Sequence, residues 1–459
     1  MGSLSGILSI ALGAMNAEQG ALSVTANNIA NVNTPGYARQ IPIFEENPAL
    51  LQGPLTFGTG VSLARIESIR DSVLEIRIHQ ESQDSGRLDA FLNAMNQIQA
   101  LFNEPAGAGL SGPLTNFFNA WQQLASDPAN LSLRQNLLTA AQNLASAFRQ
   151  TVTALDTEQH NLDLGVQQSV ATINRLTAEI ANLNGQIHAL TGAGQDASSL
   201  VAQREALLNQ LSALVDVQFI DSGNGGLTLT TAGGAPLVIG NQSFALDTAT
   251  DPSTGLTHIF SQGSDITAQI RSGQIAGLLA VRDDQIPALL GQLDTLAAGV
   301  AGAVNAQHQA GYDLNGNPGG NFFTPPPPGG AGAAASFSVA VSDPALIAAS
   351  ADGTPGNNGN ANAIAALATS AIVAGQSPAT FYAGLVFQVG NTVANASAQK
   401  DATDLVLQQL NTQRGALSGV SLDEEAASLL RFEQAYNAAA RVATTIADLT
   451  TTALQLGKD

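Results

Sequence analysis

The sequence predicts a mainly helical, elongated protein with a β-rich insertion, and three features of the chain predict this fold. Both ends are long, weakly charged amphipathic segments that could pair in the manner of a coiled coil. Apolar residues recur at helical spacing through residues 131–190, which predicts a rod of long helices. Between residues 217 and 276 the composition shifts to glycine, threonine and β-branched residues, which indicates a small antiparallel β module.

The N-terminal segment is predicted to be an amphipathic helix. Glu18 is the only charged residue before Arg39. The apolar positions that share a helix face are Leu4, Leu8, Ala11, Met15, Leu22 and Ile29. The pattern stops in the asparagine-rich segment 27–40, where Pro35 disfavours helix at the preceding residue and Gly36 supplies a turn.

The C-terminal segment, residues 421–457, predicts the second terminal helix. Ser421 and Glu424 have the spacing of a capping box, and the acidic residues of 423–425 suit the positive end of the helix dipole. Gly457 fits a C-cap. One face carries the apolar residues Leu429, Phe432, Tyr436, Ala439, Ala443, Ile446 and Ala453. Since the opposite face is mostly Thr and Ala, we expect this helix to need apolar contact on more than one side.

The segments between the ends alternate helix with extended chain. Residues 61–70 and 73–78 read either as two strands or as a strand leading into a helix. Further helices are predicted at 72–103, 114–125, 131–190, 198–215, 272–309 and 377–417. If Gly165 does not break it, the longest of these would span about 90 Å. Residues 335–341 are predicted to form one strand within the loop region.

These elements predict three domains. A terminal-helix assembly domain comprises 1–35 plus 420–459. A long-helix rod domain comprises 36–216 plus 272–419, with an extended N-terminal linker and a loop with a small extended segment at 312–360. A β-rich outer module at 217–271 is expected at the end far from the chain termini.

Composition argues against several classes of function. The formal net charge is −20 with only 16 Lys and Arg, which disfavours nucleic acid and anionic membrane surfaces as partners. The chain has no cysteine, no stretch of about 18 strongly apolar residues and no basic residue before the apolar run 7–15, so we expect no thiol chemistry, membrane span or cleaved signal peptide.

No catalytic, cofactor or metal site is expected. Asp313, Asn315 and Asn317 resemble the start of a calcium loop, but Pro318 stands where glycine is needed and Thr324 where the bidentate acid is needed. A polar turn is the better prediction. The five histidines are scattered, and Trp121 with its neighbours Phe117 and Phe118 is expected in the core.

Two end segments and three middle segments carry a family resemblance. ANNIANVNTPGY at 26–37 resembles the N-terminal signature of bacterial flagellar axial proteins (rod, hook and hook-associated), and residues 419–442 resemble their shared C-terminal segment. Residues 109–148, 200–217 and 301–323 are similar to the flagellar hook-associated protein 1 family, and GYARQ at 36–40 fits that family better than hook proteins. The similarity is weaker in 220–270 and 325–380.

The resemblance implies a structural protein of the bacterial flagellum at the junction of hook and filament. It implies export by the flagellar type III system, heterologous self-assembly through terminal helices that are poorly ordered beforehand, and an export chaperone on the C-terminal helix. The implied partners are copies of itself, hook protein, hook-associated protein 3 and the chaperone. The assembly residues it implies are Asn27, Asn28, Ile29, Asn31, Asn33, Pro35, Gly36 and Tyr37, with Leu422, Leu429, Phe432, Tyr436, Ala439, Ala443 and Ile446.

Three alternatives stay open at this point. Taken alone, the asparagine cluster of 27–33 predicts only helix termination. The chain could be a hook or rod protein, against which the long helical middle at 80–215 argues. It could also be a surface adhesin or enzyme carried on a flagellar scaffold, with a carbohydrate-binding role for the β module.

Overall fold

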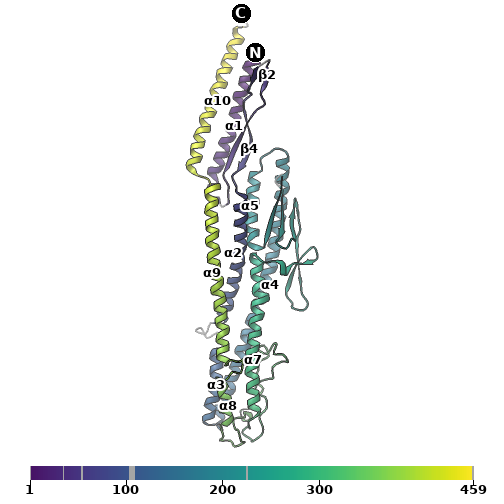
Figure 1. The fold of residues 1–459 in the computed structure, drawn as a ribbon, viewed down its shortest axis with the longest axis vertical. Helices are drawn as coiled ribbons and strands as arrows, with labels where there is room; N and C mark the ends of the chain where they lie inside the picture. The colour runs from purple at the N-terminus through teal and green to yellow at the C-terminus, as the bar shows by residue number, and fades with distance from the viewer. Residues whose placement is uncertain (1, 35, 53–54, 103–108, 224–225, 457–459) are drawn as a thin grey trace.

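The computed structural model describes residues 2–34, 36–52, 55–102, 109–223 and 226–456, so Pro35 and the predicted C-cap Gly457 lie outside it. The molecule is elongated, and its two termini lie at the same end (Figure 1). This arrangement confirms the mainly helical fold with small antiparallel sheets.

Ten α-helices lie within the described residues. Their bounds are α1 (Gly2–Ala30), α2 (Ser72–Leu101), α3 (Ser111–Ser126), α4 (Leu131–Gly192), α5 (Ser198–Leu214), α6 (Gly273–Leu279), α7 (Ile286–Gln309), α8 (Gly359–Ala366), α9 (Pro378–Ser418) and α10 (Leu422–Leu456). A π-helical turn, η3 (Ala280–Gln285), joins α6 to α7 without interruption, and the short 3-10 turns are η2 (Thr267–Gln269) and η4 (Pro344–Leu346).

The strands form four small antiparallel sheets. The linker contributes β1 (Gln40–Glu46) paired with β4 (Val61–Ser68), and β2 (Leu50–Gln52) paired with β3 (Leu55–Phe57). The β module contains a four-stranded sheet of β5 (Val217–Gly223), β6 (Gly226–Thr231), β7 (Pro236–Ile239) and β8 (Gln242–Ser243). Its three-stranded sheet consists of β9 (Leu246–Thr250), β10 (Thr257–Ser261) and β11 (Ser264–Asp265).

The terminal helices α1 and α10 lie side by side and antiparallel at one end of the molecule, as predicted (Figure 1). On α1 the buried face is made of small residues, Ala17, Ala21 and Val24, which allow a close approach. On α10 the buried apolar side chains are Phe432 and Ile446, both on the predicted apolar face.

The linker strands pack on the terminal helices. Gly20 of α1 faces β4 so closely that an added Cβ would lie 2.6 Å from the Leu63 Cδ2 atom. The Phe44 ring of β1 lies 6.2 Å, centroid to centroid, from that of Phe432. The alternative of a strand leading into a helix is the one observed, because Asp71 caps α2 by accepting hydrogen bonds from Val73 N and Leu74 N.

Below the terminal pair, α2, α4, α5, α7 and α9 run along the molecule and form the rod (Figure 1). Gly165 does not break α4; it lies where α6 crosses, and an added Cβ would meet Leu278 Cδ1 at 3.3 Å. The segment α6–α7 is long and apolar enough to cross a membrane by composition, but Leu293, Leu296 and Val300 are fully buried in the core.

The predicted position of the β module is wrong. The module lies on the flank of α4 part-way along the rod, and the end far from the termini is formed by α3, α8 and nearby loops (Figure 1). Polar side chains of α4 hold it there: Asn174 exchanges two 2.8 Å hydrogen bonds with the backbone of Leu246, and Asn184 donates to Leu227 O and Gly240 O.

Two local predictions also need correction. Residues 335–341 form no strand; a single bridge joins Val339 to Phe323, with Thr324 N donating to Ser338 O and Ala340 N donating to Phe322 O. The prolines that follow Thr324 have no N–H with which to continue the ladder. The capping box of α10 is only half made. Ser421 Oγ accepts from Glu424 N at 3.5 Å, but the Glu424 carboxylate binds Arg39 instead of returning to the cap.

The predicted aromatic core and polar turn are confirmed. Trp121 and Phe117 are fully buried with Phe322 and Phe323, which follow α7. In the turn at 313–317, Asp313 Oδ1 accepts from Asn315 N and Asn317 N, both at 2.8 Å.

Candidate assembly interface

The last turn of α1 and the first residue of β1 are joined by an asparagine side chain that replaces a strand neighbour. Asn28 Nδ2 donates to Gln40 O at 2.8 Å, and Gln40 N donates to Asn28 Oδ1 at 2.9 Å. These are the two bonds that a paired residue of an antiparallel ladder would make. Asn28 is only 1% exposed, so its amide is fully committed inside the subunit.

An ion-pair cluster connects this contact to α10. Arg39 Nε binds Glu425 Oε1 at 2.7 Å, and its Nη1 binds Glu424 Oε2 at 2.5 Å. Glu425 Oε2 accepts from Asn28 Nδ2 at 3.0 Å, and this glutamate is only 2% exposed. Hydrogen bonds to a buried charged group are stronger than neutral ones, so the cluster fixes the start of α10 against α1.

The backbone of Arg39 extends the same cluster to the rod. Arg39 N donates to Ser418 O, the last residue of α9, at 2.8 Å, and Arg39 O accepts from Ile69 N just before α2, also at 2.8 Å. We call Asn28, Arg39, Gln40, Glu424 and Glu425 the junction cluster. Through these contacts the junction cluster connects α1, the linker and α10 to the end of α9 and the start of α2, the two helices that lead into the rod.

Tyr37 covers one side of the junction cluster. Its hydroxyl donates to Asn28 Oδ1 at 3.0 Å and accepts from Asn27 Nδ2 at 3.2 Å. Burial, together with the negative charges of Glu425 and Asp196, raises the pKa of Tyr37 to about 12. Asp196 belongs to the turn between α4 and α5, so the tip of this helical hairpin also lies near the cluster.

The remaining N-terminal residues implied by the resemblance lie around the end of α1. Asn31 Nδ2 donates to Asn27 O, which closes the last turn, and Asn33 is exposed. Ile29 is half-buried, and Gly36 has φ +77°, the left-handed conformation that favours glycine. The asparagines therefore lie where α1 ends, as the sequence predicts, and Asn27 and Asn33 are at the surface of the subunit.

The C-terminal residues implied by the resemblance lie mainly on the α10 face that packs inside the subunit. Phe432 and Ile446 are buried, and Leu429, Tyr436, Ala439 and Ala443 are half-buried, while Leu422 is exposed. The exposed apolar residues farther along α10 are Leu430, Val442, Leu449 and Leu454. None of these four residues belongs to the predicted interface.

Sequence reasoning also missed Arg39 as a binding residue. Arg39 is the first basic residue of the chain and the only one before Arg65, while three adjacent acids begin α10. The scarcity of basic residues near the N-terminus was the available signal. An isolated arginine in a segment expected to pack against the acidic start of α10 predicts an ion pair between them.

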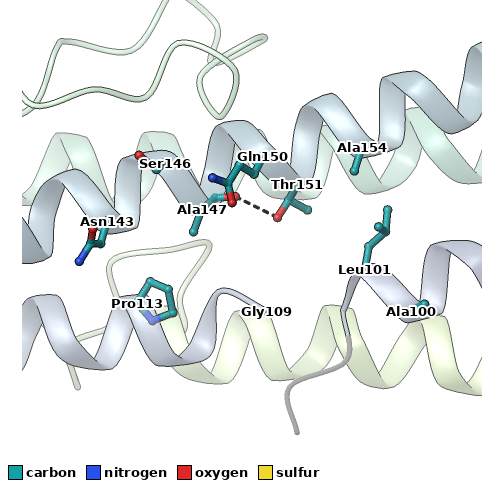
Figure 2. Close-up of a pocket in the computed structure, with 10 residues that line it drawn as sticks. All are labelled: Ala100, Leu101, Gly109, Pro113, Asn143, Ser146, Ala147, Gln150, Thr151 and Ala154. Atoms are coloured by element: carbon teal, nitrogen blue, oxygen red, sulfur yellow. Dashed lines mark hydrogen bonds between the residues drawn. The ribbon is translucent and has the colours of Figure 1, made fainter. Parts of the chain in front are cut away.

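The groove between the end of α2, the start of α3 and α4 offers no chemistry of its own. Its volume is about 480 Å³, and none of its lining residues is charged (Figure 2). Gln150 and Asn143 are among its few polar groups, and the Thr151 hydroxyl is already bonded to Ala147 O at 3.0 Å. Among the described residues, no group of three or more His, Asp or Glu could hold a metal ion.

The comparisons with known proteins agree with this geometry. Flagellar hook-associated protein 1 of Bacillus subtilis is 31% identical over 94% of each chain. The chain belongs to the flagellar hook-associated protein 1 family. The family description "Flagellar hook-associated protein FlgK helical domain" matches residues 95–323, and "Flagella basal body rod protein" matches residues 8–37.

Further family members are similar over much of the chain. Flagellar hook-associated protein 1 of Escherichia coli is 26% identical over 96% of this chain and 97% of its own length, and that of Salmonella typhimurium is 32% identical over 70% and 60%. The solved flagellar hook junction protein FlgK from Burkholderia pseudomallei shares the fold, with TM-score 0.67 and 19% identity over 74% of this chain and all of that one.

Family membership gives the chain a structural role as a hook-associated junction protein of the bacterial flagellum, and identifies it as an exported protein that assembles with other axial proteins. The helical-domain model matches residues 95–323, whereas the rod-protein model matches residues 8–37, and this difference supports the hook-associated family over a rod protein.

Proposed function

We propose that the chain forms the ring that joins hook to filament by heterologous contacts between copies of its terminal helices. The observation that carries the proposal is the set of large apolar side chains that stay exposed on the terminal pair. Leu430, Val442, Leu449 and Leu454 of α10 and Ile7 and Leu12 of α1 are each between 42% and 57% exposed. Burying such side chains is favourable, and in the assembled ring a neighbouring subunit would cover them.

The predicted interface residues are proposed to act in two ways. Asn28, Phe432 and Ile446 build the terminal pair from within, because their side chains are buried in the subunit. Asn27, Asn33 and Leu422, which are exposed, contact neighbouring subunits directly. The other described members of the predicted set are half-buried and are proposed to border this contact surface.

The assembly unit is proposed to include the linker strands. Strands β1 and β4 pack on α1 and carry Phe44 against Phe432, so residues 36–70 move with the terminal pair and not with the rod. The rod domain then begins at α2, and the module at 217–271 remains the outer part. This proposal shifts one boundary of the predicted domains.

The finer partners follow from the resemblance and family membership. We infer that hook protein lies on one side of the ring and hook-associated protein 3 on the other, and that export uses the flagellar type III channel without cleavage. An export chaperone covers the apolar surface of α10 before assembly. The chain acts structurally, without catalysis, cofactor or metal, and does not bind nucleic acid or membrane.

Two matched substitutions test the proposed contact surface. Val442→Glu places a charge on α10 at a residue that is 45% exposed, and Ile239→Glu does the same in the β module at a residue that is 49% exposed. We expect Val442→Glu to lower the amount of chain retained on isolated flagella severalfold and to raise the amount in the medium, while Ile239→Glu behaves as the parent does. Equal retention of both variants would contradict the proposal.

A further inference from the structure

A cleft lies between α1, β1 and α10, on the side of the junction cluster that faces the chain termini. Its volume is about 380 Å³, and its lining includes Glu18 of α1, Arg39 and Phe44 of the linker, and Arg431 and Phe432 of α10. Three separate segments therefore contribute to its walls.

The carboxylate of Glu18 has no partner in this cleft. Its Oε2 atom is buried, and no hydrogen bond or ion pair satisfies the carboxylate within the described residues. Burial raises the pKa of Glu18, and the nearby charge of Arg431 only opposes this in part. Leaving a buried acceptor unsatisfied is unfavourable, so the site favours a donor supplied from outside the subunit.

The cations already in the cleft are engaged elsewhere. Arg39 is shared by the carboxylates of Glu424 and Glu425. The guanidinium carbon of Arg431 lies 4.8 Å from the centroid of the Phe432 ring, in a cation–π contact. The charged groups that line the cleft are the carboxylates of Glu18 and Glu425 and the guanidinium groups of Arg39 and Arg431. Of the two carboxylates, Glu18 is the one with a buried oxygen that accepts no hydrogen bond, so a charged hydrogen-bond donor is its complementary ligand.

Arg441 is the guanidinium on the same helix that lacks a partner. Its side chain is exposed and makes no ion pair or hydrogen bond within the described part of its own subunit. Arg441 lies ten residues beyond Arg431, about 15 Å farther along α10, so it cannot turn back to Glu18 of its own chain. We propose that Arg441 of a neighbouring copy enters the cleft and pairs with Glu18.

This inference rests on the proposed function, because it requires copies to lie side by side through their terminal helices. When apolar contacts already hold two helices together, one buried ion pair mainly fixes their register and adds little affinity. The Glu18–Arg441 pair would therefore set the axial offset between adjacent subunits.

Cysteine cross-linking tests the pair directly, since the chain has no cysteine of its own. A variant with Glu18→Cys and Arg441→Cys is expressed in cells that lack the parent protein, and their isolated flagella are oxidised mildly. A disulfide needs Cα atoms about 4.4–6.8 Å apart, so a bond within one chain is excluded by the helix spacing. We expect covalent dimers and longer ladders that disappear on reduction.

The control pair is Glu18→Cys with Arg175→Cys, which places the second thiol at an exposed position of α4 on the rod. Ladders from the control as strong as those from the test pair would overturn the inference. The inference would also be overturned if the test variant is present on flagella but forms no ladders. That result would not contradict the proposed function. If the cysteine-free parent chain is itself absent from flagella, both this inference and the proposed function are overturned.

Charge reversal gives a second, independent readout. Glu18→Arg and Arg441→Glu are each expected to lower retention on flagella severalfold, and the double reversal to restore most of it. Far-ultraviolet circular dichroism of the secreted chains checks that each variant folds. A double variant retained no better than the worse single variant would overturn the pairing.

Discussion

The side chain of Asn28 makes several of the contacts that hold α1, β1 and α10 together. Its amide replaces a neighbouring strand for Gln40 and at the same time binds the buried carboxylate of Glu425. The sequence alone predicted a helix stop at this position, because asparagine is a poor helix former. The long-range contact was not predictable, since Asn28 and Glu425 are 397 positions apart.

Replacing Asn28 with alanine is expected to lower the free energy of unfolding by about 2–3 kcal/mol, because Gln40 N and Glu425 lose buried partners. Asn33→Ala, at an exposed position of the same cluster, serves as the control and should change it by less than about 0.5 kcal/mol. Urea unfolding followed by circular dichroism measures both. Equal effects would mean that the junction cluster does not hold the terminal pair.

His308 is a buried residue whose hydrogen bonds require the neutral ring. Nδ1 donates to Gly320 O at 2.7 Å, while Nε2 accepts from Ala348 N at 2.9 Å. Protonation would place a second hydrogen against Ala348 N–H. Burial accordingly lowers the pKa of His308, with a smaller opposing contribution from the bond to Gly320.

Because this pKa is lowered, the unfolded chain binds the proton more readily near pH 6.5 and below. Stability is therefore fully present above about pH 6.5 and falls with decreasing pH, by at most about 1.4 kcal/mol per pH unit from this one group. In urea titrations at pH 7.5 and 5.5, His308→Gln should lose less stability on acidification than the parent. The exposed His160→Gln should keep the parental loss, and a parental loss in His308→Gln would refute the assignment.

At the scale of elements, α4 holds the β module in place through polar contacts. Arg282, in the π-helical turn and 1% exposed, binds Asp163 of α4 at 2.6 Å and the backbone O of Thr257 in β10 at 2.9 Å. Burial opposes ionisation of Asp163, but hydrogen bonds from Thr257 and the charge of Arg282 hold its pKa below the usual value.

Removing one partner of this pair should be costly because the other charge remains buried. Asp163→Ala is expected to lower the free energy of unfolding by about 3–5 kcal/mol. The exposed pair of Arg175 and Glu179 on the same helix provides the control, and Glu179→Ala should cost less than about 1 kcal/mol. Urea midpoints of the two variants make the comparison, and similar midpoints would show that the pair does not fasten the module.

The long helices could be predicted because a continuous helical period overrides single weak residues such as Gly165. The position of the β module could not be predicted in the same way. Periodicity says which face of α4 is apolar, but not which neighbour covers it. The available signal was polar: Asp163, Asn174 and Asn184 lie about three turns apart on α4, and each binds strand backbone.

At the scale of the molecule, the sequence predicted that the two ends meet, and the structure confirms it. The sequence could not show which apolar residues of α10 are buried inside the subunit and which stay exposed. The predicted residues centre on the buried Phe432 and Ile446, and Phe432 lies against Phe44 of β1, whereas Leu430, Val442 and Leu449 stay exposed. Beyond Arg441 the only charged residue of α10 is Asp448, so all faces of this half carry apolar residues, Thr and Ala, and the pattern does not separate the inner contact from the outer one.

Thiol labelling of Val442→Cys in the otherwise cysteine-free chain is the most direct test of the proposed assembly surface. We expect fast labelling by a maleimide in the free subunit, where this residue is 45% exposed, and severalfold slower labelling in isolated flagella. Ile239→Cys, in the β module, should label equally in both. If Val442→Cys labels as fast in flagella as in the free subunit, the outer face of α10 is not an assembly surface, and the central claim is wrong.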